Sequence, residues 1–215
     1  MKPIIITNFK TFKEATGKNA VRLAKMHEKI MKKANIFVAV QAADIYRVSK
    51  NTKVRVIAQH VDYEEYGKHT GKILPEDLKD DGAVGSLINH AEDRISLSKI
   101  KKTISRCKKL KLKTIVCVES VEKAKKIAKF KPDYIAFEYP KLIGTLNSIS
   151  KVKPDEVRKF AQIINKTKSI PLCGAGIANN EDFRLSLKLG TKGVLLATAI
   201  TKAKNPGKAL KELVK

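Results

Sequence analysis

Three short apolar runs of this chain each lead into polar side chains that suit proton transfer. His90 follows one run, Glu138 follows the second, and Lys10 follows the third. An imidazole, a carboxylate and an ammonium together can move a proton and stabilise the charge that develops. We therefore expect an enzyme, provided that the fold brings these three side chains to one place. The runs span residues 83–88, 134–137 and 4–6.

The three runs belong to a set of eight that alternate with helical patterns along the whole chain. They are rich in Ile and Val and are mostly continuous, as expected for parallel strands buried on both faces. The predicted strands are Ile4 to Thr7, Ile36 to Gln41, Val54 to Gln59, Ala83 to Ile88, Thr114 to Val118, Tyr134 to Phe137, Ile170 to Cys173 and Val194 to Ala197.

Amphipathic helices are predicted between most of these strands. Ala20, Leu23, Ala24 and His27 recur at helical spacing, and Lys and Glu occupy the opposite face. The crossovers at 43–51 and 60–81 are weak or irregular. Side chains suited to capping a first turn, or prolines suited to starting one, precede several helices. These residues are Ser98, Ser120, Asn179 or Asn180, Pro75, Pro154 and Pro206.

Eight strand–helix repeats predict a single (β/α)8 barrel, the TIM-barrel fold, over residues 1–215. The chain is shorter than the roughly 250 residues typical of this fold, so we expect shortened helices and loops. An open doubly wound sheet is the alternative, which the absence of GxGxxG after the first strand disfavours. In a closed barrel the carboxyl ends of all strands form one rim, where Lys10, His90 and Glu138 would converge.

The net charge of +24 indicates attraction to nucleic acids, anionic membranes or phosphorylated small molecules. Most of the positive residues are Lys spread over every helical segment, Trp is absent and the aromatic residues are scattered. A specific nucleic-acid reader usually concentrates Arg and aromatic residues on one surface. We interpret the charge as solvated helix faces that also attract anionic metabolites, and expect no specific nucleic-acid partner.

Membrane insertion, secretion and disulfide scaffolding are all disfavoured. No apolar run is long enough to span a bilayer, and the N-terminus lacks a signal-peptide pattern, so a cytoplasmic location is expected. The three cysteines, Cys107, Cys117 and Cys173, form no CxxC pair, and their number is odd. Neither a disulfide framework nor a structural zinc site is expected from them.

Seven segments along the chain together form a recognisable set. They are Asn8-Phe9-Lys10-Thr11, Ala58-Gln59-His60-Val61-Asp62, Gly82-Ala83-Val84-Gly85, Asn89-His90-Ala91-Glu92, Glu138 to Thr145, Cys173-Gly174-Ala175-Gly176-Ile177 and Gly193-Val194-Leu195-Leu196-Ala197. Each segment alone is weakly specific, but the complete set in this order is highly specific. The set resembles the triosephosphate isomerase family in its short archaeal form.

The resemblance implies a cofactor-free and metal-free isomerase that acts on a small phosphorylated triose. The family interconverts dihydroxyacetone phosphate and D-glyceraldehyde 3-phosphate through an enediolate, in glycolysis and gluconeogenesis. Glu138 matches the base, His90 the neutral imidazole that polarises the carbonyl, and Lys10 the stabilising cation. Glu92 would pair with Lys10 or hydrogen-bond nearby. A homodimer or homotetramer is also implied.

Substrate binding is implied for a further set of rim residues. Backbone N–H groups, rather than an Arg cluster, would hold the phosphate. They come from Gly144, from the turn 174–176 and from the helix start at Thr198-Ala199, while residues 139–145 form a lid that excludes water. The implied binding residues are Asn8, Ile143, Gly144, Gly174, Ala175, Gly176, Ala197 and Thr198.

Several positions depart from the family pattern without removing a proton-transfer group. Tyr139 follows the base where Pro is usual, and Leu146 replaces the Gly that usually follows the lid. Ala91 replaces a Ser beside His90, and Thr198-Ala199 replace smaller residues in the last phosphate turn. These departures bear on lid kinetics and phosphate affinity more than on the reaction.

Two other functions remain as alternatives. The chain could be another phosphate-binding barrel enzyme that acts on a related sugar phosphate, although a metal-dependent form lacks the necessary His/Asp cluster at the rim. It could instead be a basic binding module that only keeps the fold. The intact set of Lys10, His90 and Glu138 argues against such a module.

Overall fold

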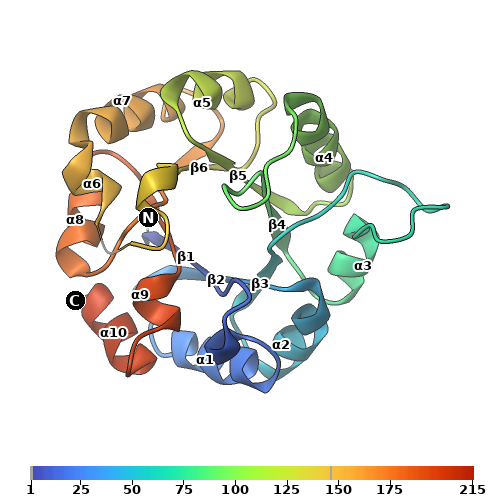
Figure 1. The fold of residues 1–215 in the computed structure, drawn as a ribbon, viewed down its shortest axis with the longest axis horizontal. Helices are drawn as coiled ribbons and strands as arrows, with labels where there is room; N and C mark the ends of the chain where they lie inside the picture. Colours follow the sequence, from blue (N-terminus) through green and yellow to red (C-terminus); the bar gives the residue numbers. More distant parts are fainter. Residues whose placement is uncertain (1, 146) are drawn as a thin grey trace.

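Eight parallel strands close into a barrel in sequence order, and this confirms the predicted (β/α)8 fold (Figure 1). The structure is a computed structural model that describes residues 2–145 and 147–215. The observed bounds agree closely with the predicted runs. They are β1 Ile4–Asn8, β2 Asn35–Val40, β3 Arg55–Ala58, β4 Gly85–Ile88, β5 Lys113–Val118, β6 Tyr134–Phe137, β7 Ile170–Cys173 and β8 Gly193–Leu196.

Helices form a ring outside the strands (Figure 1). Several are short, as the length of the chain predicted, and α3 is preceded by a long irregular segment. The helices are α1 Lys18–Glu28, α2 Ile45–Asn51, α3 Pro75–Asp80, α4 Leu97–Lys109, α5 Val121–Ala128, α6 Ile149–Val152, α7 Pro154–Ile164, α8 Asn180–Lys188, α9 Thr198–Thr201 and α10 Pro206–Leu213, with 3-10 turns η1 Lys13–Ala15, η2 Ala42–Asp44 and η3 Pro140–Leu142.

The predicted helix starts are confirmed with one exception. Ser120 and Asn179 cap α5 and α8 through their side-chain oxygens, and the three prolines begin α3, α7 and α10. The prediction that Ser98 caps α4 was wrong. Ser96 has the extended backbone of a cap residue and accepts a hydrogen bond from the Lys99 N–H, whereas Ser98 lies inside the helix. A cap must precede the first turn to reach its unpaired N–H groups.

Two apolar layers hold the barrel together. One fills the barrel interior, and the other lies between the strands and the surrounding helices. In the outer layer Phe137 of β6 stacks on Phe160 of α7, with ring centroids 5.1 Å apart. Cys107, Cys117 and Cys173 are buried within these layers as free thiols. The strand ends at the rim are thus fixed by two closely packed apolar layers.

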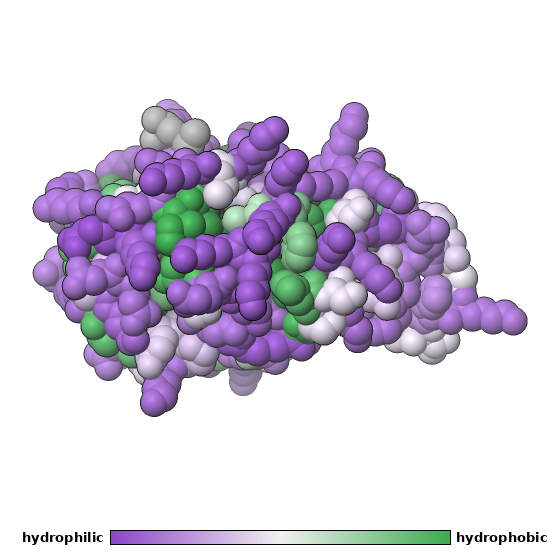
Figure 2. All heavy atoms as spheres, turned by 90° about the horizontal axis from the view of Figure 1, so that it is seen from above, coloured by the Kyte–Doolittle hydropathy of each residue, from purple (hydrophilic) through white to green (hydrophobic). Residues whose placement is uncertain are grey.

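Hydrophilic side chains cover most of the face shown in Figure 2, with small apolar areas between them. This agrees with the interpretation of the Lys-rich sequence as solvated helix faces. Within residues 2–145 and 147–215, no helix combines the length and hydropathy needed to cross a membrane.

His27, which the sequence places in an apolar helix stripe, is completely buried between α1 and β1. Its Nδ1 lies 2.9 Å from the Leu23 carbonyl oxygen, and its Nε2 lies 2.9 Å from the Thr7 hydroxyl. A neutral ring serves both partners, with Nδ1 donating to Leu23 and Nε2 accepting from Thr7. Burial lowers the pKa of His27 from 6.5 to about 4, although the Leu23 carbonyl opposes the shift.

We predict that His27 makes the stability of the protein fall as the pH drops from 6.5 to about 4. In this window the unfolded chain binds a proton that the folded chain excludes, so lowering the pH favours unfolding. The full effect is about 3 kcal/mol, reached below both pKa values. Urea unfolding of the wild type and of His27→Gln across this range measures it. A stability difference between the two proteins that does not change with pH would contradict the prediction.

Candidate active site

Lys10, His90 and Glu138 line one small cavity at the carboxyl ends of the strands. Lys10 follows β1, His90 follows β4 and Glu138 follows β6, so barrel closure unites residues that are distant in sequence. Every residue for which the sequence implied a substrate contact also lines this cavity. These residues are Asn8, Ile143, Gly144, Gly174, Ala175, Gly176, Ala197 and Thr198, and Thr145, Ile177, Leu195, Leu196 and Ala199 complete the wall.

Lys10 is fixed by its backbone as well as by its ammonium. Its φ of 49° is in the left-handed region, which a non-glycine residue rarely adopts. The Asn8 side chain accepts from its N–H at 2.9 Å, and Gln59 donates to its carbonyl at 2.9 Å. The Lys10 ammonium then lies 2.5 Å from a carboxylate oxygen of Glu92. A positive charge is therefore held at a defined point on the cavity wall.

His90 is buried between two carboxylates. Its Nε2 lies 3.3 Å from Oε1 of Glu138, and its Nδ1 lies 3.7 Å from Oε2 of Glu92. The Glu92 backbone N–H also donates to Nδ1 of His90 at 3.2 Å. That contact requires a free lone pair on Nδ1, so it favours the neutral ring with its proton on Nε2.

The pKa of His90 reflects a competition between these surroundings. Burial is the largest single influence and lowers the pKa, but the hydrogen bond and the negative charge of Glu138, with help from Glu92, outweigh it. The net result is a pKa raised above its ordinary value of 6.5. The protonation of His90 therefore depends on whether Glu138 touches it.

Glu138 is a buried carboxylate with one oxygen unpaired. It is 3% exposed, and its Oε2 has no hydrogen-bond partner among residues 2–145 and 147–215. Cys117, on the neighbouring strand, lies inside the barrel; its burial and the nearby charge of Glu138 hold the pKa of its thiol well above 9.0. The thiol of Cys117 therefore stays protonated beside the carboxylate.

Several backbone N–H groups at the cavity wall are available to an anion. Those of Gly144, Gly176 and Ala199 have no hydrogen-bond partner in the described part of the chain. The N–H of Gly174, by contrast, donates to the Phe137 carbonyl at 2.9 Å, so our expectation that the whole turn 174–176 offers N–H groups needs correction at this residue. A Cβ at Gly174 would meet Cγ of Glu138 at 3.1 Å, so glycine here leaves room for the carboxylate.

The segment 139–145 borders the cavity and includes the turn η3. Gly176 has a φ of +66°, and a Cβ there would meet the Asn147 carbonyl oxygen at 1.9 Å. Only glycine therefore lets the residues after the lid pack against the turn 174–176. At the start of the segment 139–145, the centroid of the Tyr139 ring lies 4.5 Å from the ammonium of Lys153. The departure noted at Leu146 lies outside the described residues.

Two polar residues at the end of β3 had no role assigned from the sequence. Gln59 orients the backbone of Lys10, and His60 contacts carboxylates of two rim loops. A polar pair directly after a buried strand was the only sequence signal for them. In residues 2–145 and 147–215, no group of three or more His, Cys, Asp or Glu side chains is arranged to hold a metal ion.

Comparison with known proteins identifies the family. Residues 3–215 match the family model described as triosephosphate isomerase. The triosephosphate isomerase of Methanobacterium bryantii is 44% identical over 99% of this chain and 96% of its own length. That of Methanocaldococcus jannaschii is 42% identical over 99% of both chains.

A solved structure supports the fold independently. The crystal structure of triosephosphate isomerase from Bartonella henselae superposes with a TM-score of 0.76 at 20% identity and covers 100% of both chains. The relatives found by sequence are mostly archaeal, as the short-form motifs implied. This chain belongs to the triosephosphate isomerase family.

Proposed function

We propose that the protein interconverts dihydroxyacetone phosphate and D-glyceraldehyde 3-phosphate through an enediolate. The observation that carries this proposal is the single cavity shared by Lys10, His90 and Glu138. The cavity wall supplies a base, a hydrogen-bond donor and a cation, together with N–H groups for a phosphate. Isomerisation of a triose phosphate needs all four.

The phosphate would bind the N–H groups of Gly144, Gly176 and Ala199. Unpaired backbone donors in a turn and at a helix start favour an anion through partial charge and directed hydrogen bonds. The net charge of +24 also favours the approach of an anionic substrate. Held there, the substrate directs its carbon chain toward Glu138 and His90 on the same wall.

Glu138 would remove the proton from the carbon beside the carbonyl and return it to the neighbouring carbon. The unpaired oxygen of Glu138 accepts the proton, while its burial keeps water from competing for the carboxylate. The electron pair of the C–H bond forms a carbon–carbon double bond, and the carbonyl oxygen takes the negative charge. The substrate thus becomes an enediolate. Lys10 lowers the energy of that negative charge.

His90 would donate from Nε2 to the carbonyl oxygen and shuttle the proton between the two oxygens. A neutral donor suits this role because it does not trap the enediolate as a stable ion pair. The raised pKa of His90 depends on its contact with Glu138. Substrate placed between the two side chains breaks that contact, so burial and the Glu92 N–H then favour the neutral ring.

The segment 139–145 would act as the lid of this site. Its Gly144 lines the same cavity as the catalytic groups, so closing the segment over the substrate excludes water from the enediolate. The contact between Tyr139 and Lys153 anchors the entry end of the lid, where the family usually has Pro.

We further propose a cytoplasmic homodimer or homotetramer. The segment between β3 and α3 extends outward from the barrel (Figure 1), and its Tyr66 is 70% exposed. Tyrosine is enriched at protein–protein interfaces, because its ring packs while its hydroxyl can still hydrogen-bond. A reaction on a phosphorylated triose suits the cytoplasm.

We predict that the wild type isomerises D-glyceraldehyde 3-phosphate without added metal and that Glu138→Gln lowers turnover by about 10²–10⁴. The amide keeps the shape of the carboxylate but cannot accept the proton. A coupled assay of dihydroxyacetone phosphate measures both proteins, and Glu122→Gln, at an exposed position, controls for the charge change. No wild-type turnover, together with salt-sensitive retention on RNA, would instead support the basic binding module.

We predict that Glu138→Gln also lowers the pKa of His90. Without the charge of Glu138, burial becomes the dominant influence on the imidazole. Titration of the ring followed by NMR in the substrate-free protein measures the pKa, with Glu122→Gln again as the control. An unchanged or higher pKa in Glu138→Gln would show that the two side chains do not interact.

A further inference from the structure

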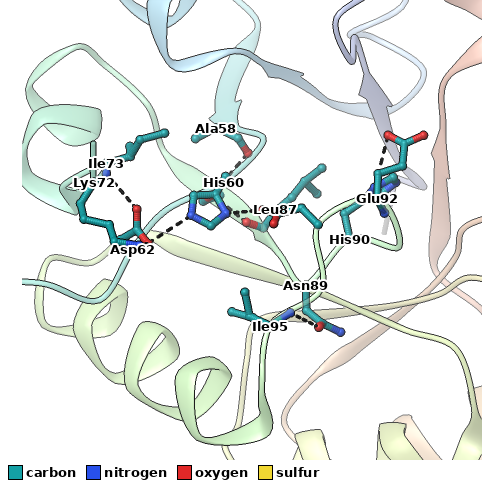
Figure 3. Close-up of polar contacts among 12 residues, drawn as sticks. Ala58, His60, Asp62, Lys72, Ile73, Leu87, Asn89, His90, Glu92 and Ile95 are labelled. Carbon is teal, nitrogen blue, oxygen red and sulfur yellow. Dashed lines mark hydrogen bonds and ion pairs between the residues drawn. The ribbon is translucent and has the colours of Figure 1, made fainter. Parts of the chain in front are cut away.

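His60 joins two loops of the rim that are separate in sequence. Its Nδ1 lies 2.6 Å from a carboxylate oxygen of Asp93, in the loop after β4. Its Nε2 lies 3.4 Å from a carboxylate oxygen of Asp62, in the segment after β3. Figure 3 shows the imidazole between Asp62 and the loop that carries His90 and Glu92. One ring therefore bridges the two loops.

The Asp62 side of the bridge is anchored firmly. The Ile73 N–H donates to Asp62 at 2.9 Å, and the Lys72 ammonium lies 3.2 Å away. Burial opposes the charge of Asp62, but these two partners and His60 outweigh it and hold the pKa of the carboxyl below its usual 3.8. Asp62 is a carboxylate fixed on the β3 side, so it gives the ring a stable support.

The Asp93 side of the bridge leads directly to the candidate catalytic groups. The Asp93 N–H donates to the His90 carbonyl at 2.9 Å, which makes residues 90–93 a tight turn. Within this turn Glu92 contacts both the His90 ring and the Lys10 ammonium. Displacing Asp93 would therefore move His90, one of the three groups that the proposed reaction needs, and Glu92, which holds a second, Lys10.

The start of the same loop is held by Asn89, whose φ of 61° is in the left-handed region. The Asn89 side chain donates to the Cys117 carbonyl at 2.8 Å and accepts from the Ile95 N–H at 3.1 Å. Asn89 thus ties the start of the loop to its far end at Ile95, and between them Asp93 contacts His60. Lys10 also contacts the loop at Glu92, and Arg94 pairs with Glu119 at 2.6 Å, while His60 supplies the contact from the segment after β3.

We propose that His60 is a positioning residue that sets the orientation of the loop 90–93 and, through it, of His90 and Glu92. This rests on the proposed isomerase function. His60 does not line the cavity that holds the phosphate donors and Glu138, but it lines the adjoining hollow with Lys10, His90 and Asp93. The Asp93 side chain is 57% exposed, so water screens the pair, and its effect is on geometry more than on stability.

Two substitutions at His60 separate its two contacts. In His60→Asn the side-chain amide occupies the position of Nδ1 and can still donate to Asp93. In His60→Gln the amide reaches the position of Nε2 and can contact only Asp62. Because a displaced catalytic group can cost up to about 10²-fold, we expect His60→Gln to lower kcat about tenfold, with KM changed less than about twofold.

His60→Asn should restore most of the lost turnover, and the melting temperatures of the two variants should be similar. KM is spared because the phosphate donors lie on other loops. Equal kcat values for the Asn and Gln variants, or a loss confined to KM, would overturn the proposal. If a His60 variant fails to fold, Asp93→Ala, at an exposed position, removes the same contact and should reduce kcat alone.

Failure of the proposed role of His60 can be distinguished from failure of the proposed isomerase function. A wild type without isomerase turnover contradicts the function itself. A wild type that turns over, together with an Asp93→Ala variant of unchanged kcat, leaves the function intact and contradicts only the role of His60.

Discussion

Closure of the parallel barrel is the constraint on which the site depends. Strand β1 pairs with β2 on one side and with β8 on the other, so Ile5 lies opposite both Ile36 and Val194. Because all eight strands run in the same direction, every loop after a strand emerges at one rim. An open sheet would leave the first and last strands far apart, separating Lys10 from the helix start at Thr198.

Within that rim, orientation comes from the backbone more than from the charged groups themselves. Lys10 and Asn89 both adopt left-handed conformations, each of which costs roughly 1–2 kcal/mol for a non-glycine residue. Hydrogen bonds that involve the side chains of Asn8, Gln59 and Asn89 offset this cost. The strain places the Lys10 side chain and the turn 90–93 at the cavity, where chemistry requires them.

The strands and the cavity lining were predictable because their signals are local. Buried parallel strands are continuous apolar runs, and rim residues immediately follow them, so Lys10, His90 and Glu138 stood out before their contacts were known. The family motifs supplied the turn 174–176 and the lid. His27 lies in a buried helix stripe as its spacing predicted, but that pattern does not reveal its bond to Thr7.

The remaining features depend on contacts that sequence distance conceals. Ser96 and Ser98 both resemble caps, and only the backbone conformation distinguishes them. The N–H of Gly174 is taken by Phe137 on the neighbouring strand, which no pattern within the turn indicates. The contact between His60 and Asp93 joins two loops after different strands, and it exists only because β3 and β4 are neighbours.

The central claim is that Glu138 carries a proton between adjacent carbons of a triose phosphate. Isomerisation in D2O, followed by NMR of the product, tests it most directly. A carboxylate that exchanges its proton with solvent during the enediolate stage will leave deuterium on the carbon that receives the proton. We expect Glu138→Gln to lose this incorporation together with its turnover. Deuterium incorporated by Glu138→Gln at the wild-type rate would mean that another group is the base.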